Sequence, residues 1–219
     1  MAKATGPRRD YRTKDGTRVP GVTTVIGRFK ESGGLVHWAW ELGREGKDYR
    51  QERDSAADAG TLAHAWIDDL IHERPKSEAT GYTQEQQNNA SEALDAFKRW
   101  LDVTGLKITE TEIPLVSEKH RFGGTIDALG SEGEKMVVLD WKTSKRVYHD
   151  YLYQIAAYGL LLRENRGTVP EEFHLVRLDK EHASVHHHSW RKASLHKAAQ
   201  AFVLMRQLYD LDKVVKDML

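Results

Sequence analysis

The chain has 219 residues, carries 33 Lys and Arg against 33 Asp and Glu, and contains no cysteine. A chain of this length buries about 70% of its unfolded surface, so we expect one domain over residues 1–219. Zero formal net charge excludes a strongly basic protein, so any nucleic-acid-binding patch has to be local, and the lack of cysteine excludes disulfides. No secretory signal or bilayer-spanning apolar run is found, which predicts a cytoplasmic protein.

The N-terminal part predicts a tail, a small hairpin and then helices. Residues 1–20 read as a flexible tail, followed by a turn between short β-prone arms. Residues 21–105 are mainly helical, and within them Trp38 and Trp40 interleave with basic residues such as Arg44. This mixture can stack bases and neutralise phosphates, although two tryptophans so close together are more often packing residues.

The apolar stripe of residues 55–74 has helical spacing, and His64 lies slightly off that stripe. A lone helical histidine is usually structural or exposed. Asp68 lies one turn further along the same face, where it orients the His64 imidazole or is simply a solvated charge. The next helix is predicted to end at Gly105.

Residues 106–190 predict the sheet, which begins with a strand in KITETEIPLVS. Regular alternation places Glu110 and Glu112 on one face, and Pro114 indicates an edge strand or a strand end. Strand glutamates usually face solvent, so alternation alone does not single out either one.

The runs FGGTIDAL and KMVVLDWKT flank a polar, Gly-containing tip, which predicts a β-hairpin carrying Asp127, Asp140 and Lys142. If Ser131 pairs with Met136, Asp127 lies opposite Asp140, with Cβ atoms roughly 4.5–5.5 Å apart. Two carboxylates that close repel unless they share a cation, and their oxygens suit Mg²⁺ or Mn²⁺. The pattern therefore predicts metal-assisted phosphodiester hydrolysis. The alternative without a catalytic role is an ordinary surface ion pair between Asp140 and Lys142.

The segment after the hairpin supplies hydroxyls and cations that can hold phosphates, or else an exposed basic loop; these residues are Thr143, Ser144, Lys145 and Arg146. The following helix places Gln154 and Tyr158 on one stripe. Two closing strands and a terminal helix over residues 191–219 complete the predicted elements.

The ordered set of motifs resembles the PD-(D/E)XK nuclease superfamily, in its RecB-like branch of phage and mitochondrial genome-maintenance exonucleases. The likeness is carried by His64 in GTLAHAWID, Glu112 in TEIPL, Asp127, Asp140-Trp141-Lys142, and Gln154 with Tyr158. The proline of the family name is replaced by Ile126, which removes no ligand.

The resemblance implies an α/β, restriction-endonuclease-like core with a mixed central sheet, flanking helices and an N-terminal helical portion. It also implies one or two Mg²⁺ or Mn²⁺ ions held by Asp127, Asp140, the Trp141 carbonyl and His64, with Glu112 as a further ligand. Lys142 would position the attacking water, supported by Gln154 and Tyr158. The iron-sulfur cluster of some RecB-like relatives is excluded because the chain has no cysteine.

The expected function is metal-dependent exonuclease action on single-stranded or free-ended DNA, in phage-type recombination, repair or genome processing. Trp38, Trp40, Arg44 and residues 143–146 would contact the DNA. Alternatives are a structure-selective endonuclease resembling junction resolvases, a noncatalytic nucleic-acid-binding module, and a helicase-coupled nuclease subunit. The chain has no G-x-x-x-x-G-K-[ST], so a helicase would be a separate partner, as would a recombinase or a single-strand-binding protein.

Overall fold

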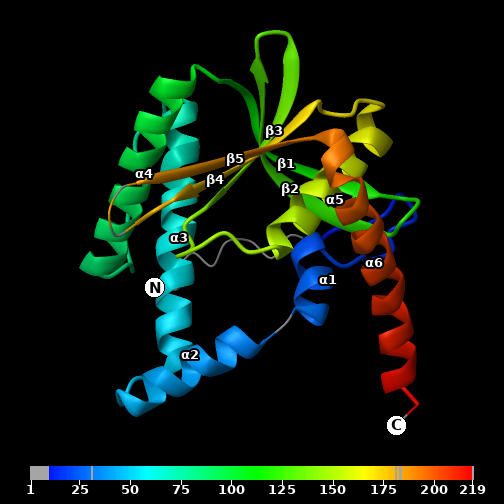
Figure 1. Ribbon diagram of the computed structural model, residues 1–219, viewed down its shortest axis with the longest axis horizontal. Helices are drawn as coiled ribbons and strands as arrows, with labels where there is room; N and C mark the ends of the chain where they lie inside the picture. The colour runs from blue at the N-terminus through cyan, green and yellow to red at the C-terminus, as the bar shows by residue number, and fades with distance from the viewer. Residues whose placement is uncertain (1–9, 31, 181, 183, 219) are drawn as a thin grey trace.

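The protein is described by a computed structural model covering residues 10–218 except 31, 181 and 183, so the predicted tail at residues 1–9 lies outside the described residues. Four helices precede the strands, and a further helix follows them (Figure 1). In chain order the elements are α1 (Val22–Phe29), α2 (Gly33–Arg44), α3 (Tyr49–Ile71), α4 (Gln84–Thr104), β1 (Lys107–Ser117), β2 (Phe122–Glu132), β3 (Lys135–Lys142), α5 (Asp150–Arg166), β4 (Glu172–Leu178), β5 (Val185–Arg191), the 3₁₀ turn η1 (Lys192–Leu195) and α6 (His196–Lys216).

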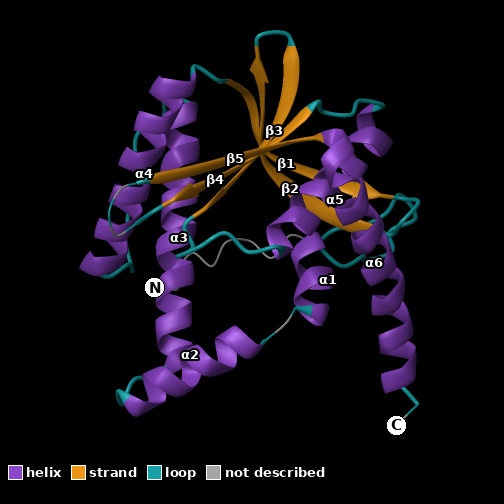
Figure 2. Cartoon of the chain, in the orientation of Figure 1, coloured by secondary structure: helices purple, strands orange, loops and turns teal. Residues whose placement is uncertain are grey.

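The five strands form one sheet in the order β1-β2-β3-β4-β5 (Figure 2). Only the β3–β4 pair within this sheet is parallel, because helix α5 carries the chain from the end of β3 back to the start of β4. The sheet is therefore mixed and flanked by helices, which confirms the predicted α/β class. Ser131 pairs with Met136, so the predicted hairpin register is also confirmed.

Each face of the sheet is covered by a separate set of helices, which gives two hydrophobic cores. Because side chains alternate along a strand, β3 contributes residues to both cores. Val137, Leu139 and Trp141 pack with α3 and α4, whereas Val138 packs with α5. Helices α1 and α6 contribute to the core on the α5 face. Because Asp140 and Lys142 alternate with the residues that face α4, their side chains are directed towards α5.

Local signals account for several element boundaries. Thr83 accepts a hydrogen bond from the backbone of Gln86, whose side chain bonds back to the Thr83 backbone; this capping box begins α4. Gly105, at φ +63°, ends that helix in the left-handed conformation that glycine adopts readily. No helix in the described part of the chain combines the length and apolar character needed to cross a membrane.

The predicted N-terminal hairpin is a small turn closed by a bridge between Arg12 and Arg18, and it docks on β2. Tyr11 packs so closely over Gly123 that an added Cβ would lie 2.2 Å from its ring. The Gly123 amide donates to the Pro20 carbonyl over 3.0 Å. The glycine pair at the start of β2 thus serves internal packing, not the approach of DNA phosphates.

Candidate active site

The end of β3 and the middle of α5 form a buried polar cluster around Asp140. This carboxylate is 1% exposed, and its two oxygens lie 2.8 and 2.6 Å from Nζ of Lys142. The Gln154 amide donates to Asp140 Oδ1 over 3.1 Å and to the Tyr158 hydroxyl over 2.7 Å. The spacing of four on α5 brings Gln154 and Tyr158 together as the sequence predicts.

Asp127 lies on β2 where its pairing with β3 ends at Ala128 and Leu139. Its Oδ2 accepts the backbone N–H of Trp141 over 3.1 Å, so the carboxylate takes the bond that a strand carbonyl would otherwise accept. The side chain is buried. The predicted neighbourhood of Asp127 and Asp140 is consistent with this register, and the charge of Asp127 contributes to a raised pKa of Asp140.

Three possible metal-ligating atoms, one each from His64, Glu112 and Asp127, lie within 4.8 Å of one another. His64 comes from α3, Glu112 from β1 and Asp127 from β2. Imidazole nitrogen and carboxylate oxygens together suit a small divalent cation such as Mn²⁺ or Mg²⁺. The donor chemistry therefore fits the metal site implied by the resemblance.

The His64 ring is oriented by the Trp141 indole, which donates to Nδ1 over 3.2 Å. Asp68 does not take this role: it accepts hydrogen bonds from Thr111 and Arg74, so the first of the two alternatives that the sequence left open for Asp68, orientation of His64, is wrong. A neutral imidazole that accepts at Nδ1 carries its proton on Nε2. Ligation of a cation at either nitrogen of His64 consequently requires the indole hydrogen bond to open.

The electrostatics of the cluster favour the binding of a further positive charge. Burial raises the pKa of Asp127 to about 6, with a further contribution from Glu112, against the opposing effect of Lys142. Burial likewise raises the pKa of Asp140 to about 6, and Asp127 adds to that rise. Two buried carboxylates thus face one ammonium group, and a bound cation would relieve the excess negative charge.

The other titrating groups respond to the same environment. Burial lowers the pKa of His64 to about 4, and the charge of Lys142 acts in the same direction. Burial also acts to lower the pKa of Lys142, but Asp140 and Asp127 outweigh it and the pKa is raised. Lys142 is therefore an ammonium donor at neutral pH, and His64 is a neutral imidazole.

Regular alternation would place Glu110 and Glu112 of β1 on the same face, but irregularities in the backbone direct their side chains to different places. A register shift lies between Ile108 and Glu110, and Glu112 has φ +50°. Glu110 forms a bidentate pair with Arg166 over 2.7 and 2.9 Å. The structure therefore brings Glu112 to the cluster and directs Glu110 elsewhere, which resolves the alternative left by the sequence.

The loop after β3 contributes to a cavity of about 240 Å³. The sequence indicated only some of the residues that line this cavity. It is lined by Thr143, Ser144, Lys145, Arg177, Asp179 and Lys180. Arg177 pairs with Lys142 in the parallel register and donates to the backbone carbonyls of Ser144 and Lys145, each over 3.2 Å. No local pattern indicates Arg177, because its proximity depends on the β3–β4 crossover.

The remaining predicted DNA contacts are divided between the loop and α2. The guanidinium of Arg146 lies 5.9 Å from the centre of the Tyr148 ring. On α2, Trp40 is 57% exposed with the Arg44 guanidinium 4.8 Å from its ring centre, whereas Trp38 is partly buried. Helix α2 lies at the far end of α3 from the hairpin tip (Figure 1). Trp38, Trp40 and Arg44 are not among the groups found around Asp127 and Asp140 in the described part of the chain.

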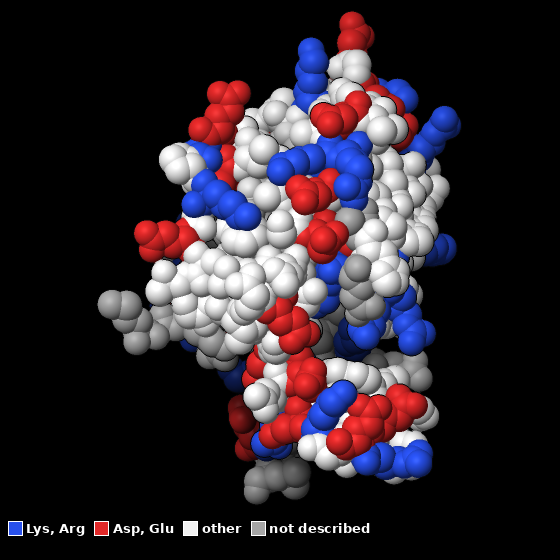
Figure 3. Space-filling model, turned by 90° about the vertical axis from the view of Figure 1, so that its left-hand side faces the viewer, with Lys and Arg blue, Asp and Glu red and all other residues white. Residues whose placement is uncertain are grey.

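The side of the molecule shown in Figure 3 mixes acidic and basic side chains without a large area of one sign. This agrees with the equal numbers of acidic and basic residues in the chain. Attraction of a polyanion therefore depends on local groups, such as those of the loop cavity.

Buried carboxylates that can hold a divalent cation beside a lysine are the groups used in metal-assisted phosphodiester hydrolysis, so the fold and the site define the class as a nuclease. The sequence profile of the PD-(D/E)XK nuclease superfamily matches residues 8–217, and the chain belongs to that superfamily. Among curated proteins no match is found.

Three solved structures of low identity match parts of the chain. A protein from Eubacterium rectale, provisionally assigned as an exonuclease, is 14% identical with a TM-score of 0.46; the match covers 67% of this chain and 64% of that one. An alkaline exonuclease from Laribacter hongkongensis is 13% identical with a TM-score of 0.37, covering 73% of this chain and 86% of that one. The same exonuclease in complex with dAMP is 14% identical with a TM-score of 0.37, covering 74% of this chain and 93% of that one.

Proposed function

We propose that this nuclease is a Mg²⁺- or Mn²⁺-dependent DNA exonuclease that acts on single-stranded or free-ended DNA. The observation that carries the proposal is the pair of buried carboxylates, Asp127 and Asp140, beside Lys142, with ligand atoms of Asp127, His64 and Glu112 within 4.8 Å of one another. Such an activity would serve recombination, repair or genome processing of the phage type.

The proposed ligands are Asp127, Asp140, the Trp141 backbone carbonyl, His64 and Glu112, for one or two ions. A divalent cation bound there would lower the pKa of a water molecule and neutralise charge on the scissile phosphate. The residues themselves supply the fixed geometry, because Asp127 is held by the Trp141 amide and Asp140 by Gln154.

Lys142 acts as a hydrogen-bond donor and not as a base, because its raised pKa keeps it protonated. Its ammonium group orients the attacking water and stabilises the negative charge that develops on the phosphate. Gln154 uses both amide protons, one on Asp140 and one on Tyr158. The Tyr158 oxygen therefore accepts, and its own proton remains available to donate to a phosphate oxygen.

The DNA strand would contact the loop of residues 143–146 and the exposed aromatic surface of α2. The hydroxyls of Thr143 and Ser144 and the charge of Lys145 suit phosphate oxygens, since charge-assisted hydrogen bonds are the stronger kind. Trp40, with Arg44 over its ring, offers a stacking platform that does not depend on base identity. Trp38 would support this platform from its partly buried position.

The test is digestion of end-labelled linear and closed circular DNA, single-stranded and duplex, with Mg²⁺, Mn²⁺ or EDTA. We expect metal-dependent loss of linear strands alone, reduced by about 10²-fold or more in Asp140→Asn and Glu112→Gln. Glu110→Gln is the matched control, because Glu110 is an acid of the same strand that pairs with Arg166.

Two other outcomes would replace the proposal. Cleavage of circular or branched DNA at the rate of linear DNA would make the protein a structure-selective endonuclease. Binding of DNA without cleavage under any metal would make it a noncatalytic binding module, or a subunit that needs a separate helicase.

A further inference from the structure

Helix α3 carries two polar groups that reach different parts of the sheet, one turn apart. His64 lies with Asp127 and Glu112, and Asp68 reaches Thr111 on β1. Thr111 immediately precedes Glu112. The helix that supplies one proposed ligand is thus bonded to the residue beside another.

The backbone of Glu112 is unusual. Its φ of +50° lies in the left-handed region, which a residue with a Cβ adopts at an energetic cost. Its neighbours keep their places in the sheet, with Thr111 paired to Ala128 and Ile113 to Ile126. In a regular strand, Thr111 facing α3 would turn Glu112 to the opposite face, away from His64. The left-handed backbone at Glu112 therefore goes together with placing its carboxylate on the same side of the sheet as the His64 imidazole.

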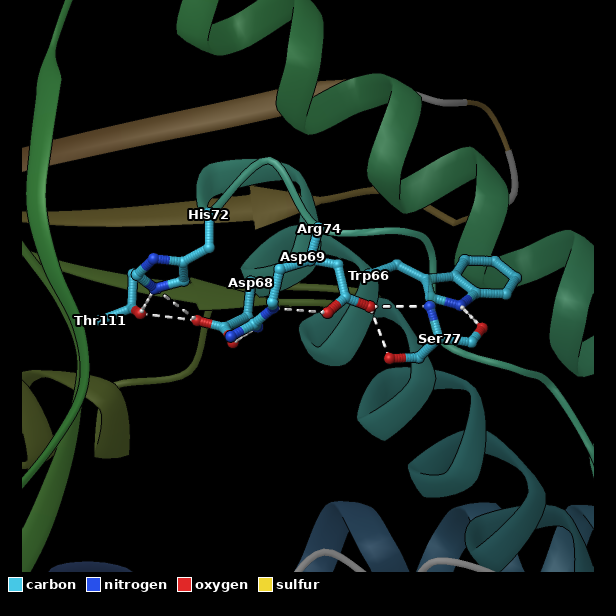
Figure 4. Close-up of polar contacts among 7 residues, drawn as sticks. All are labelled: Trp66, Asp68, Asp69, His72, Arg74, Ser77 and Thr111. Carbon is cyan, nitrogen blue, oxygen red and sulfur yellow. Dashed lines mark hydrogen bonds and ion pairs between the residues drawn. The ribbon is translucent and has the colours of Figure 1, made fainter.

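Strand β1 lies at the edge of the sheet, so only β2 fixes it by backbone hydrogen bonds within the sheet. A side-chain clamp holds it from the helix side (Figure 4). The Thr111 hydroxyl donates to Asp68 Oδ1 over 2.6 Å, and His72 Nε2 lies 2.7 Å from the same hydroxyl. Because a carboxylate can only accept, the Thr111 proton goes to Asp68 and the His72 N–H donates to Thr111.

The clamp is fixed in turn by the chain that follows α3. Asp68 also pairs with Arg74, whose Nε donates to Asp69 Oδ1 over 3.1 Å. Asp69 is buried and accepts from the backbone and hydroxyl of Ser77, over 2.8 and 2.5 Å. Figure 4 shows these residues as one continuous row from Thr111 to Ser77. The position of Asp68 is therefore set by several contacts and not by a single surface pair.

We propose that Asp68 and His72, acting through the Thr111 hydroxyl, are positioning residues that hold Glu112 in its left-handed, cation-facing conformation. Through Glu112 they set the affinity of the site for a divalent cation. The inference rests on the proposed function, because it takes Glu112 as a ligand.

The test uses Thr111→Val, which keeps the shape and the β-branch but removes both hydrogen bonds, and Thr111→Ser, which keeps the hydroxyl. Thr109→Val is the matched control: Thr109 lies on the same strand as Thr111, and the substitution removes a hydroxyl hydrogen bond to the Leu129 carbonyl of β2. Titration of each protein with Mn²⁺ in the absence of DNA is followed by calorimetry. We expect Thr111→Val to bind Mn²⁺ about 10-fold more weakly, with Thr111→Ser and Thr109→Val close to wild type.

A second measurement tests the clamp separately from the proposed nuclease function. In metal-free protein, the one-bond Cα–Hα coupling constant of residue 112 reports the sign of φ. We expect a positive φ in wild type, Thr111→Ser and Thr109→Val, and its loss in Thr111→Val. If wild type binds no cation and cuts no DNA but Thr111→Val still loses the positive φ, the proposed function fails and the clamp stands. Retention of positive φ in Thr111→Val, or equal Mn²⁺ affinity where wild type binds the ion, overturns the inference.

Discussion

Replacing Asp127 by asparagine should stabilise the metal-free protein at neutral to alkaline pH. Asp127 and Asp140 are buried beside the partly buried Lys142, so these three groups, when ionised, carry one negative charge more than positive charge. Asparagine has nearly the same shape, and its amide oxygen can still accept the Trp141 N–H. The substitution leaves Asp140 and Lys142 as a balanced pair.

The magnitude follows from the pKa of Asp127, which burial raises from 3.8 to about 6. A rise of roughly two units corresponds to about 3 kcal/mol between the two protonation states. Because the two acids titrate as a coupled pair, this is an upper value, and we expect a gain of about 1–3 kcal/mol at pH 8. Because the pKa of Asp127 is raised on folding, its contribution to the free energy of unfolding of wild type is fully present below pH 3.8. That contribution is lost as the pH rises through about 6. The gain should therefore fall below about 1 kcal/mol at pH 4.

The assay is urea unfolding of wild type and Asp127→Asn in EDTA at pH 4 and pH 8, with Glu110→Gln as the exposed-acid control. A gain of this size also corresponds to a rise in Tm of roughly 2–10 °C. Saturating Mg²⁺ should reverse the order at pH 8, because only wild type retains the full ligand set. Equal or lower stability of Asp127→Asn at pH 8 in EDTA, or a gain that does not change with pH, would refute the reasoning.

Three further predictions test other parts of the structure. Lys142→Met should reduce cleavage by about 10²-fold or more while Mn²⁺ binding persists, because the acids remain; loss of both together would contradict a donor role. Gly123→Ala should destabilise the fold by about 1–3 kcal/mol in urea unfolding, since its Cβ would overlap Tyr11, whereas Gly27→Ala, with open space at its Cβ, should be neutral or slightly stabilising. Trp40→Ala should weaken single-stranded DNA binding by about 1–3 kcal/mol in fluorescence titrations without changing Mn²⁺ affinity, and unchanged DNA affinity would remove α2 from the binding surface.

The parts of the site that follow regular geometry could be predicted from the sequence. A strand alternates and a helix repeats, so the positions of Asp140 and Lys142 on one face, and of Gln154 beside Tyr158, need only the element type. The polar tip between two apolar runs predicted the hairpin, and the structure has the pairing of Ser131 with Met136 that the sequence could state only as a condition.

The parts that depend on distant contacts could not be predicted. A shared helix face made orientation of His64 one of two alternatives for Asp68, but its partners include Thr111, 43 residues away. Regular alternation treated Glu110 and Glu112 as equivalent, whereas a register shift and one positive φ separate them. Neither irregularity has a signal within the strand, because each depends on what α3 and β2 place beside it. Arg177 likewise enters the loop cavity only through the pairing of β4 with β3.

These departures from local rules cluster at the acidic site. Asp127 and Asp140 are buried carboxylates with raised pKa values, and Glu112 holds a backbone conformation that its side chain disfavours. Each lowers the stability of the metal-free fold, and each would be relieved or used by a cation bound at the proposed site. A structure selected for stability alone would remove these three features first. Their coincidence at one point, held by separate elements, is therefore independent physical support for a cation-dependent reaction there.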